Sequence, residues 1–204
     1  MKTLVFILMG YLSGSVLYAR VFAGIFGKEE MIENSKDKNP GTANAFMYGG
    51  FLCGVMTLVF DILKGFVPVY LFMRYVGVIH PDSIGMALVL AAPVVGHAFP
   101  VFYKMKGGKG IAVTFGCLLG LLPSWKPVVI LAAYFIFFSC ILRVTPHFYR
   151  TLAAYLCSLC SMAHNIDQSA VLIGFAIITI VVCIRMFASG EEKERMRIRL
   201  LWMH

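Results

Sequence analysis

Long apolar runs separated by short polar segments constrain the fold of this 204-residue chain more than any other feature. A helix needs about 20 apolar residues to cross the hydrocarbon core of a bilayer. Backbone groups in lipid must also be hydrogen-bonded internally, which a helix achieves within one segment. The sequence therefore predicts an all-α, polytopic membrane protein that forms a single domain over residues 1–204. We expect about seven transmembrane helices, at approximately 1–26, 45–74, 84–102, 111–122, 127–142, 150–163 and 170–188.

Composition excludes the main alternatives to a membrane protein. Hydrophobic residues make up 60% of the chain and charged residues 14%, and the mean hydropathy is +0.83. These values lie well outside the range of soluble domains. The net charge of +8 would also suit nucleic acid, but the basic residues gather at the ends of apolar runs. They form no basic face with interleaved aromatic residues, so we expect no nucleic-acid partner.

Cysteine and histidine spacing gives no sign of a metal site. All six cysteines lie in apolar stretches, and Cys157 and Cys160 form a C-x-x-C without a second ligand pair. His147 and His164 fall in separate predicted loops with no metal-ligand spacing. We interpret the cysteines as buried thiols, and we predict neither a metal nor a cofactor.

The basic residues are divided unevenly between the two sides of the predicted bundle. When spans alternate, segments 27–44, 103–110 and 143–150 and the C-terminal tail fall on one side. With the nearby span ends, that side holds fourteen basic residues: Arg20, Lys28, Lys36, Lys38, Lys104, Lys106, Lys109, Arg143, Arg150, Arg185, Lys193, Arg195, Arg197 and Arg199. The other side holds three: Lys2, Arg74 and Lys126. The positive-inside rule then predicts an external N-terminus and a cytoplasmic C-terminus.

Residues 96–110 join two apolar runs and carry an unusual concentration of lysine and glycine. Glycine lets backbone N–H groups approach a ligand closely, and lysine supplies positive charge. A helix beginning near Ile111 would add its unpaired N–H donors at the same place. The segment therefore suits a phosphate group, although an ordinary cytoplasmic loop would also be rich in lysine. The residues concerned are Lys104, Lys106, Gly107, Gly108, Lys109 and Gly110.

A second polar segment, residues 35–44, is predicted to share this side of the membrane. It reads Ser35-Lys36-Asp37-Lys38-Asn39-Pro40-Gly41-Thr42-Ala43-Asn44 and ends at a predicted helix start. Asn44 or Thr42 would make a suitable N-cap, so a turn followed by a cap would explain the segment in isolation. Two Gly/Asn/Lys-rich segments on one face favour a joint polar site.

Three ionisable residues in predicted spans are candidates for function: Asp61, Lys64 and His97. Asp61 and Lys64 are spaced i,i+3, which lets their side chains meet on one helical face. Ionisable residues inside a span are functional candidates, although an internal ion pair could also serve only helix packing. His97 lies where a span meets the lysine-rich loop, where it could act as a general base or as a hydrogen-bonding fixture.

These motifs together resemble the bacterial membrane acyl-phosphate:glycerol-3-phosphate acyltransferase family over nearly the whole chain. The match at residues 96–110 is the most specific. Other motifs of the family are matched at separate points along the sequence. The motifs are Gly14-Ser15, Asn39-Pro40-Gly41-Thr42-Ala43-Asn44, Asp61-x-x-Lys64-Gly65, Gly96-His97-x-x-Pro100-Val101-Phe102, Lys106-Gly107-Gly108-Lys109-Gly110 and Gly190-x-Glu192. The resemblance implies seven membrane helices with an active site at the cytoplasmic face of the inner membrane.

The resemblance also implies the reaction and its substrates. The family transfers an acyl chain from acyl phosphate to glycerol 3-phosphate, which gives lysophosphatidic acid for phospholipid biosynthesis and releases phosphate. The residues carried over as catalytic are His97, Lys109 and Lys64. Those carried over as substrate-binding are Ser35, Asn39, Gly41, Thr42, Asn44, Asp61, Lys104, Lys106, Gly107, Gly108, Gly110 and Glu192. The general base would be His97 or the substrate's own phosphate.

The chain departs from the family pattern at three places. Lys36-Asp37-Lys38 stands where the family has Gly-Ser-Gly, Met47 replaces an arginine, and Cys183 replaces an asparagine. These differences motivate a second hypothesis, in which a non-enzymatic relative binds or transports an anionic lipid or a phosphorylated solute. A third hypothesis is a structural helper that contacts other lipid-synthesis enzymes.

Overall fold

The computed structural model describes residues 1–77, 84–190 and 195–200, and within them the chain is mostly helical. The α-helices are α1 (Lys2–Ser15), α2 (Tyr18–Ile25), α3 (Thr42–Gly49), α4 (Phe51–Phe72), α5 (Ile84–Ala98), α6 (Ile111–Leu119), α7 (Lys126–Ile136), α8 (His147–Asn165) and α9 (Ser169–Ala188). Short 3₁₀ turns lie at η1 (Glu29–Met31) and η3 (Val101–Tyr103), and π-helical turns at η2 (Met73–Gly77) and η4 (Phe137–Ile141). Two strands, β1 (Leu142–Thr145) and β2 (Arg197–Leu200), complete the fold.

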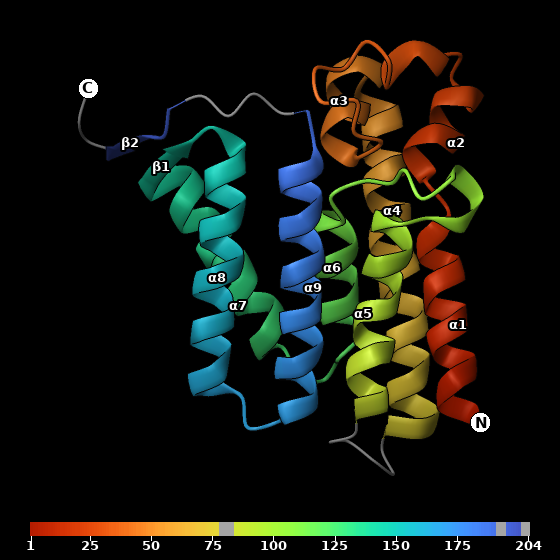
Figure 1. Ribbon diagram of the computed structural model, residues 1–204, viewed down its shortest axis with the longest axis vertical. Coiled ribbons are helices and arrows are strands. Elements are labelled where there is room, and N and C mark those ends of the chain that lie inside the picture. Colours follow the sequence, from red (N-terminus) through yellow and green to blue (C-terminus); the bar gives the residue numbers. More distant parts are fainter. Residues whose placement is uncertain (78–83, 191–194, 201–204) are drawn as a thin grey trace.

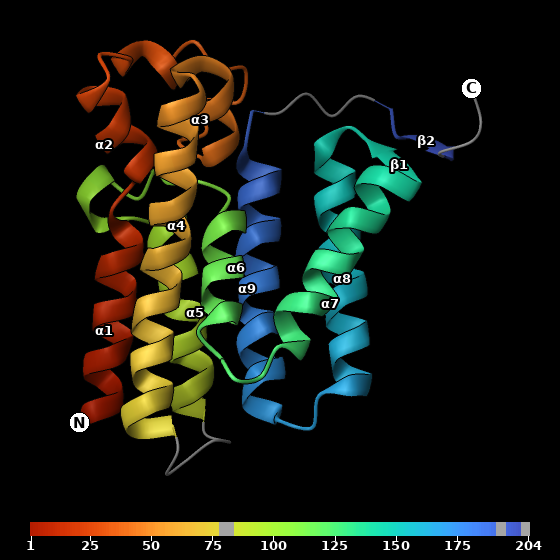
Figure 2. The same ribbon diagram turned by 180° about the vertical axis from the view of Figure 1, so that it is seen from behind.

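The long helices run roughly along one axis, as Figures 1 and 2 show from opposite sides. Helix α1 packs against α5, α4 against α6, α5 against α9, and α7 against α8. The largest buried apolar cluster lies between α4, α5, α6, α8 and α9, and includes Phe72, Leu90, Leu118, Phe175 and Ile178. This cluster fixes the relative positions of the helices that the polar segments connect.

Three helical segments in the described residues are long and apolar enough to cross a membrane: Phe51–Val76, Ile84–Tyr103 and Ser169–Ala188. The pair α1 and α2, bent by 41°, would make a fourth. Each predicted span corresponds to a helical segment, but the number seven is not confirmed. Helix α6 has nine residues and is about 14 Å long, well short of a hydrocarbon core of about 30 Å.

Two of the predicted spans are broken helices. The first span divides after α1, where Val16 takes an extended conformation (φ −75°, ψ 117°). The carbonyl of Val16 accepts a hydrogen bond from Lys64 Nζ at 2.6 Å, so the break places a backbone acceptor in the bundle. The second span divides at Gly50, whose φ of +90° ends α3 and precedes α4. Glycine suits this position because other residues are strained there.

Small residues allow α1 and α5 to approach closely. A Cβ atom on Gly14 would lie 2.1 Å from the carbonyl oxygen of Pro93. A Cβ atom on Gly96 would lie 2.1 Å from the carbonyl oxygen of Tyr11. Close backbone approach at small residues is a common mode of helix association in membranes. This packing holds the end of α5, and with it His97, against α1.

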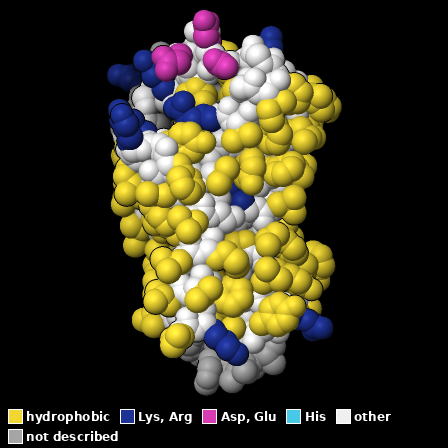
Figure 3. Space-filling model, turned by 90° about the vertical axis from the view of Figure 1, so that its right-hand side faces the viewer, with side chains coloured by type: hydrophobic (Ala, Val, Ile, Leu, Met, Phe, Trp, Pro, Cys, Tyr) yellow, Lys and Arg dark blue, Asp and Glu magenta, His cyan; other side chains and the backbone are white. Residues whose placement is uncertain are grey.

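The polar segments gather toward one end of the bundle, as the alternation of spans predicts. Figure 1 shows α2, α3, β1 and β2 at that end, with the N-terminus and the α8–α9 turn at the other. On the face seen in Figure 3, a broad hydrophobic band separates a charge-rich end from an end with few charges. The lysine-rich loop also lies toward the charge-rich end.

The expectation of a purely α-helical chain is wrong in one detail. The predicted fifth span ends in η4 and then β1, which pairs antiparallel with β2 in the C-terminal tail. Leu142 pairs with Leu200, and Thr145 pairs with Arg197. Strand pairing between residues so far apart leaves no local pattern in the sequence.

Candidate active site

A cavity of about 1000 Å³ lies among the polar segments and the helix ends next to them. Its walls come from the segment before α3, from α3 and α4, from the start of α6, and from the β1–α8 corner with the tail. The polar and charged residues in the lining are Lys36, Asp37, Asn39, Thr42, Asn44, Asp61, His97, Lys109, Thr145, His147, Arg150, Arg195 and Arg197. The larger apolar residues in the lining are Met47, Leu58, Ile111, Val113 and Phe115. The cavity therefore combines a basic region with an apolar one.

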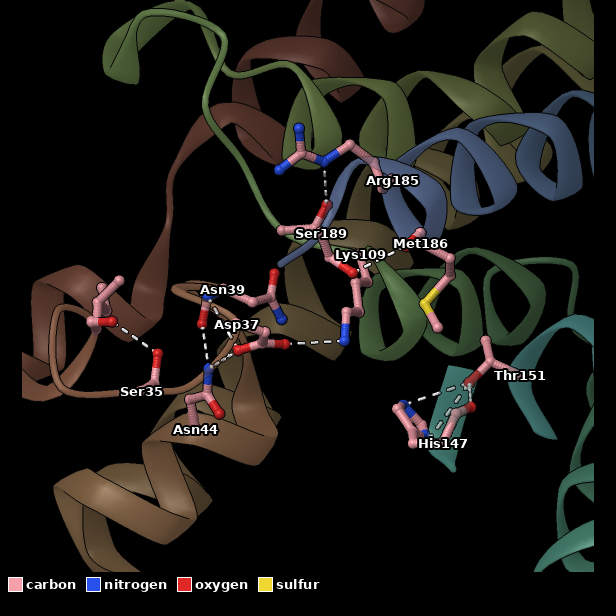
Figure 4. A network of polar contacts seen from close by, with 12 residues as sticks. Ser35, Asp37, Asn39, Asn44, Lys109, His147, Thr151, Arg185, Met186 and Ser189 are labelled. Carbon is pink, nitrogen blue, oxygen red and sulfur yellow. Dashed lines mark hydrogen bonds and ion pairs between the residues drawn. The ribbon is translucent and has the colours of Figure 1, made fainter. Parts of the chain in front are cut away.

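An ion pair between Lys109 and Asp37 joins the two polar segments. Lys109 Nζ donates to Asp37 Oδ2 at 2.9 Å, and the Lys109 side chain is only 8% exposed. Asn44 Nδ2 donates to the other Asp37 oxygen at 2.7 Å and to the Asn39 carbonyl at 2.8 Å. Figure 4 shows these side chains converging from different segments. The sequence predicts that both segments form one site. They meet in the ion pair between Lys109 and Asp37.

The Asp37 carboxyl is tuned by these neighbours. Burial alone would raise its pKa. The Asn44 amide and the Lys109 ammonium outweigh this effect, with help from the backbone N–H of Asn39, so the pKa lies below its ordinary value. The carboxylate therefore stays ionised and holds the Lys109 ammonium at the cavity.

The predicted capping role of Thr42 and Asn44 is wrong. Helix α3 begins at Thr42 itself, with Gly41 as its N-cap and no side-chain cap. Thr42 Oγ1 instead donates to Asp61 Oδ2 at 3.5 Å, and the Asn44 amide is used by Asp37. Thr42 thus contacts α4, and Asn44 stabilises the turn of its own segment around Asp37. Neither side chain is used as the helix cap that the sequence pattern favours.

Lys64 and Asp61 form the predicted pair, with Lys64 Nζ 2.7 Å from Asp61 Oδ1. The same ammonium lies 2.8 Å from Nδ1 of His97 and 2.6 Å from the Val16 carbonyl oxygen. Three acceptors therefore surround its three N–H groups. Lys64 is 4% exposed and, unlike Asp61 and His97, is not part of the cavity lining. In this structure each of its donors has a protein partner, and a role of Lys64 toward a ligand phosphate stays a prediction.

His97 lines the cavity from the end of α5 and is 2% exposed. Because an ammonium only donates, Nδ1 of His97 accepts from Lys64, and a neutral imidazole then carries its proton on Nε2. Gly108 packs directly against that ring. A Cβ atom on Gly108 would lie 2.3 Å from His97 Nε2 and 3.2 Å from Asn39 Oδ1. Only glycine fits at this position without moving the imidazole.

Helix α9 anchors the lysine-rich loop from outside the cavity. Arg185 Nε donates to the Gly108 carbonyl at 3.3 Å, and its guanidinium also donates to the Gly107 carbonyl. The loop then turns into α6 at Gly110, whose φ of +79° places it in the left-handed region. The helix begins at Ile111, as predicted. Lys109 and the first turn of α6 are thereby fixed at the cavity wall.

A buried chain of hydroxyl groups supports the same turn. Tyr155 in α8 donates to Thr114 Oγ1 at 2.9 Å, and Thr114 Oγ1 donates to the Gly110 carbonyl at 2.9 Å. Both side chains are fully buried. Tyr155 is therefore a positioning residue for the turn that holds Lys109.

We expect Tyr155→Phe to weaken this support without abolishing it. The loss of one buried hydrogen bond costs about 0.5–1.5 kcal/mol. The support is only weakened, because Thr114 keeps its bond to the Gly110 carbonyl. The Tm of the purified protein and its affinity for inorganic phosphate should both fall slightly. Tyr134→Phe is the matched control, since Tyr134 stacks on Phe138 away from this chain. Equal behaviour of the two variants would contradict a positioning role.

Several predicted site residues lie away from the cavity. Lys104 and Lys106 are exposed and not in the lining, so the loop brings only Lys109 inward. Ser35 is buried, and its hydroxyl donates to the Ile32 carbonyl at 2.6 Å. Gly107 and Gly108 are buried and are not in the lining. Glu192 lies outside the described residues.

The sequence interpretation missed a group of basic residues and one carboxylate in the cavity. Asp37 shares its segment with predicted residues, and the i,i+3 spacing of His147 and Arg150 was a local signal. Arg150 lies 2.8 Å from Nδ1 of His147. The full group is Lys36, Asp37, His147, Arg150, Arg195 and Arg197. The tail residues gave no local signal, because only the β1–β2 pairing brings them to the site.

These features define a class: helical membrane proteins with a partly basic, partly apolar cavity at one end of the bundle. The sequence matches the glycerol-3-phosphate acyltransferase family over residues 4–192. The chain therefore belongs to that family.

Two curated relatives are glycerol-3-phosphate acyltransferases from bacteria. The Shewanella loihica protein is 36% identical over 140 residues, which is 65% of this chain and 66% of the relative. The protein of Legionella pneumophila strain Corby is 42% identical over 113 residues, which is 55% of this chain and 39% of the relative. The matched region thus spans about two thirds of one relative and two fifths of the other.

The fold is similar to that of a solved family member along most of its length. The crystal structure of PlsY (YgiH), an integral membrane glycerol 3-phosphate acyltransferase in its glycerol 3-phosphate form, superposes with a TM-score of 0.78. The sequences are 25% identical, and the match covers 92% of this chain and 90% of that one. The helical membrane fold and the family are therefore established together.

Proposed function

We propose that the chain transfers an acyl group from acyl phosphate to glycerol 3-phosphate, which gives lysophosphatidic acid and phosphate. The observation that carries the proposal is one cavity lined by both basic and apolar side chains. Both substrates carry phosphate, and one also carries a long apolar chain. Leu58 and Phe115 belong to the apolar lining, which suits the acyl chain. The relatives' names and the PlsY structure support the same reaction.

Lys109 and the first turn of α6 stabilise the phosphate that leaves. The Lys109 ammonium, Gly110, Ile111 and Ala112 line the cavity together. Unpaired N–H groups at a helix start favour anions, and preorganised donors aimed at developing charge are often the largest catalytic contribution. No cofactor or metal takes part in this account. The acyl phosphate is already activated, so the reaction needs no covalent intermediate on the protein.

The hydroxyl group of glycerol 3-phosphate attacks the acyl carbonyl carbon. A new C–O ester bond forms, the bond between the acyl carbon and the phosphate oxygen breaks, and inorganic phosphate leaves. The tautomer that Lys64 imposes on His97 favours Nε2–H as a hydrogen-bond donor rather than a base. The hydroxyl proton then passes to substrate phosphate, the other candidate base. Asn39 and Thr42, which line the cavity, orient the acceptor.

The decisive experiment uses the purified chain with acyl phosphate and labelled glycerol 3-phosphate. Formation of labelled lysophosphatidic acid together with stoichiometric phosphate is expected. Folded protein that gives no product would overturn the proposal. Uptake of either phosphorylated compound into proteoliposomes without acyl transfer would instead favour a transporter. Co-purification with another lipid-synthesis enzyme would support the contact that we expect with such partners.

We further propose seven membrane-spanning segments in the inner membrane, with the N-terminus outside and the cavity facing the cytoplasm. The uneven division of basic residues and the clustering of the polar segments at one end support this topology. Single cysteines placed at Lys38 and Gln168 test it in a background without the native cysteines. A membrane-impermeant thiol reagent applied outside the cell should label residue 168 and not residue 38. The reverse pattern would invert the topology.

A further inference from the structure

The C-terminal strand β2 contributes to the cavity although it lies beyond the family match, which ends at residue 192. Its register with β1 pairs Thr145 with Arg197 and Val144 with Ile198. Thr145 Oγ1 also donates to the Arg197 carbonyl at 3.4 Å. Residues paired across an antiparallel ribbon point to the same face. Thr145 and Arg197 accordingly both line the cavity, and Arg195 lies there with them.

Among the residues that the structure describes, this wall of the cavity brings several basic side chains together and includes no carboxylate. Arg195 and Arg197 share it with Arg150 and His147 at the start of α8. The carboxylates in the described lining are Asp37 and Asp61, and each already lies within 3 Å of a lysine: 2.9 Å for Asp37 and 2.7 Å for Asp61. Like charges held close together repel one another, and a bound anion removes that cost.

Resting on the proposed function, we propose that Arg195 and Arg197 bind a substrate phosphate at this second wall. The guanidinium fork matches two phosphate oxygens at once. Lys109 and the start of α6 bind the phosphate that leaves acyl phosphate. The tail strand supplies positive charge for the phosphate of glycerol 3-phosphate. The chain thereby sets its affinity for a phosphorylated substrate with residues outside the matched region. Specificity for that phosphate depends on the pairing of β2 with β1.

The test compares four full-length proteins: the parent, R195Q/R197Q, R195K/R197K and R199Q. Arg199 is the matched control, because it lies on the same strand but is not in the lining. We expect R195Q/R197Q to raise the KM for glycerol 3-phosphate by about tenfold. The inhibition constant of inorganic phosphate should rise by a similar factor. The value of kcat should change less. R195K/R197K should recover part of the loss, and R199Q should match the parent.

Unchanged KM and inhibition constants in R195Q/R197Q, or an equal loss in R199Q, would overturn the inference. Thermal unfolding with and without inorganic phosphate gives a readout independent of catalysis. The phosphate-induced rise in Tm should be smaller in R195Q/R197Q than in R199Q. If the parent binds phosphate in this way but transfers no acyl group, the proposed function fails while the anion site stands.

A lipid headgroup offers the same phosphate chemistry, so the kinetics are repeated in two kinds of vesicle. One contains only phosphatidylcholine, and the other also contains phosphatidylglycerol. A defect of R195Q/R197Q that is equal in both supports a substrate phosphate. A defect confined to the vesicles with phosphatidylglycerol would assign the arginines to the lipid surface and would overturn the inference.

Discussion

Lys64→Met is expected to destabilise the folded protein by about 3–5 kcal/mol, because it leaves Asp61 as an uncompensated buried charge. Asp61 is 2% exposed, and Lys64 Nζ lies 2.7 Å from it. The same change removes the donors to His97 Nδ1 and to the Val16 carbonyl. Thermal unfolding in detergent measures the loss. Leu63→Met is the control, since Leu63 is exposed on the same helix.

The double variant Asp61→Asn with Lys64→Met separates charge balance from positioning. Removal of both charges should restore most of the folding free energy. Acyl transfer should still fall by about a hundredfold, because His97 loses the partner that fixes its tautomer and orientation. A fully active double variant would show that Lys64 only neutralises Asp61. A double variant as unstable as Lys64→Met would show that the Val16 contact dominates.

Lys109→Ala is expected to reduce acyl transfer and phosphate affinity by about tenfold to a hundredfold, which corresponds to about 1.5–3 kcal/mol for one charge-assisted contact. Lys126→Ala is the control, because Lys126 is exposed at the start of α7, away from the cavity. Initial rates and inhibition by inorganic phosphate measure the effect. Equal losses in both variants would indicate that the lysine-rich loop sets only the membrane orientation of the chain and does not bind phosphate.

Loss of Lys109 also leaves Asp37 without its ion pair, which could lower activity through local unfolding. Lys109→Ala with Asp37→Asn removes both charges and tests this route. We expect the double variant to recover stability but not phosphate affinity, since in the proposed function the ammonium itself contacts the substrate phosphate. Recovered affinity would assign Lys109 a structural role beside Asp37.

Local features of the sequence were enough to predict the helical membrane class, the approximate helix positions and the start of α6 at Ile111. These follow from apolar run length and from the breaking effect of glycine, which act over a few residues. The Asp61–Lys64 pair was predictable for the same reason, because an i,i+3 spacing fixes two side chains on one helical face.

Only the tertiary structure decided which side chains meet at the cavity. Lys109 reaches Asp37 across 72 residues and Lys64 reaches His97 across 33, so neither contact leaves a periodic signal. The helix break at Val16 supplies a carbonyl that accepts from Lys64, whose ammonium also contacts His97. The pairing of β2 with β1 likewise brings tail arginines to the site. Such contacts depend on how helices and strands pack in space, and that packing is set by the whole chain at once.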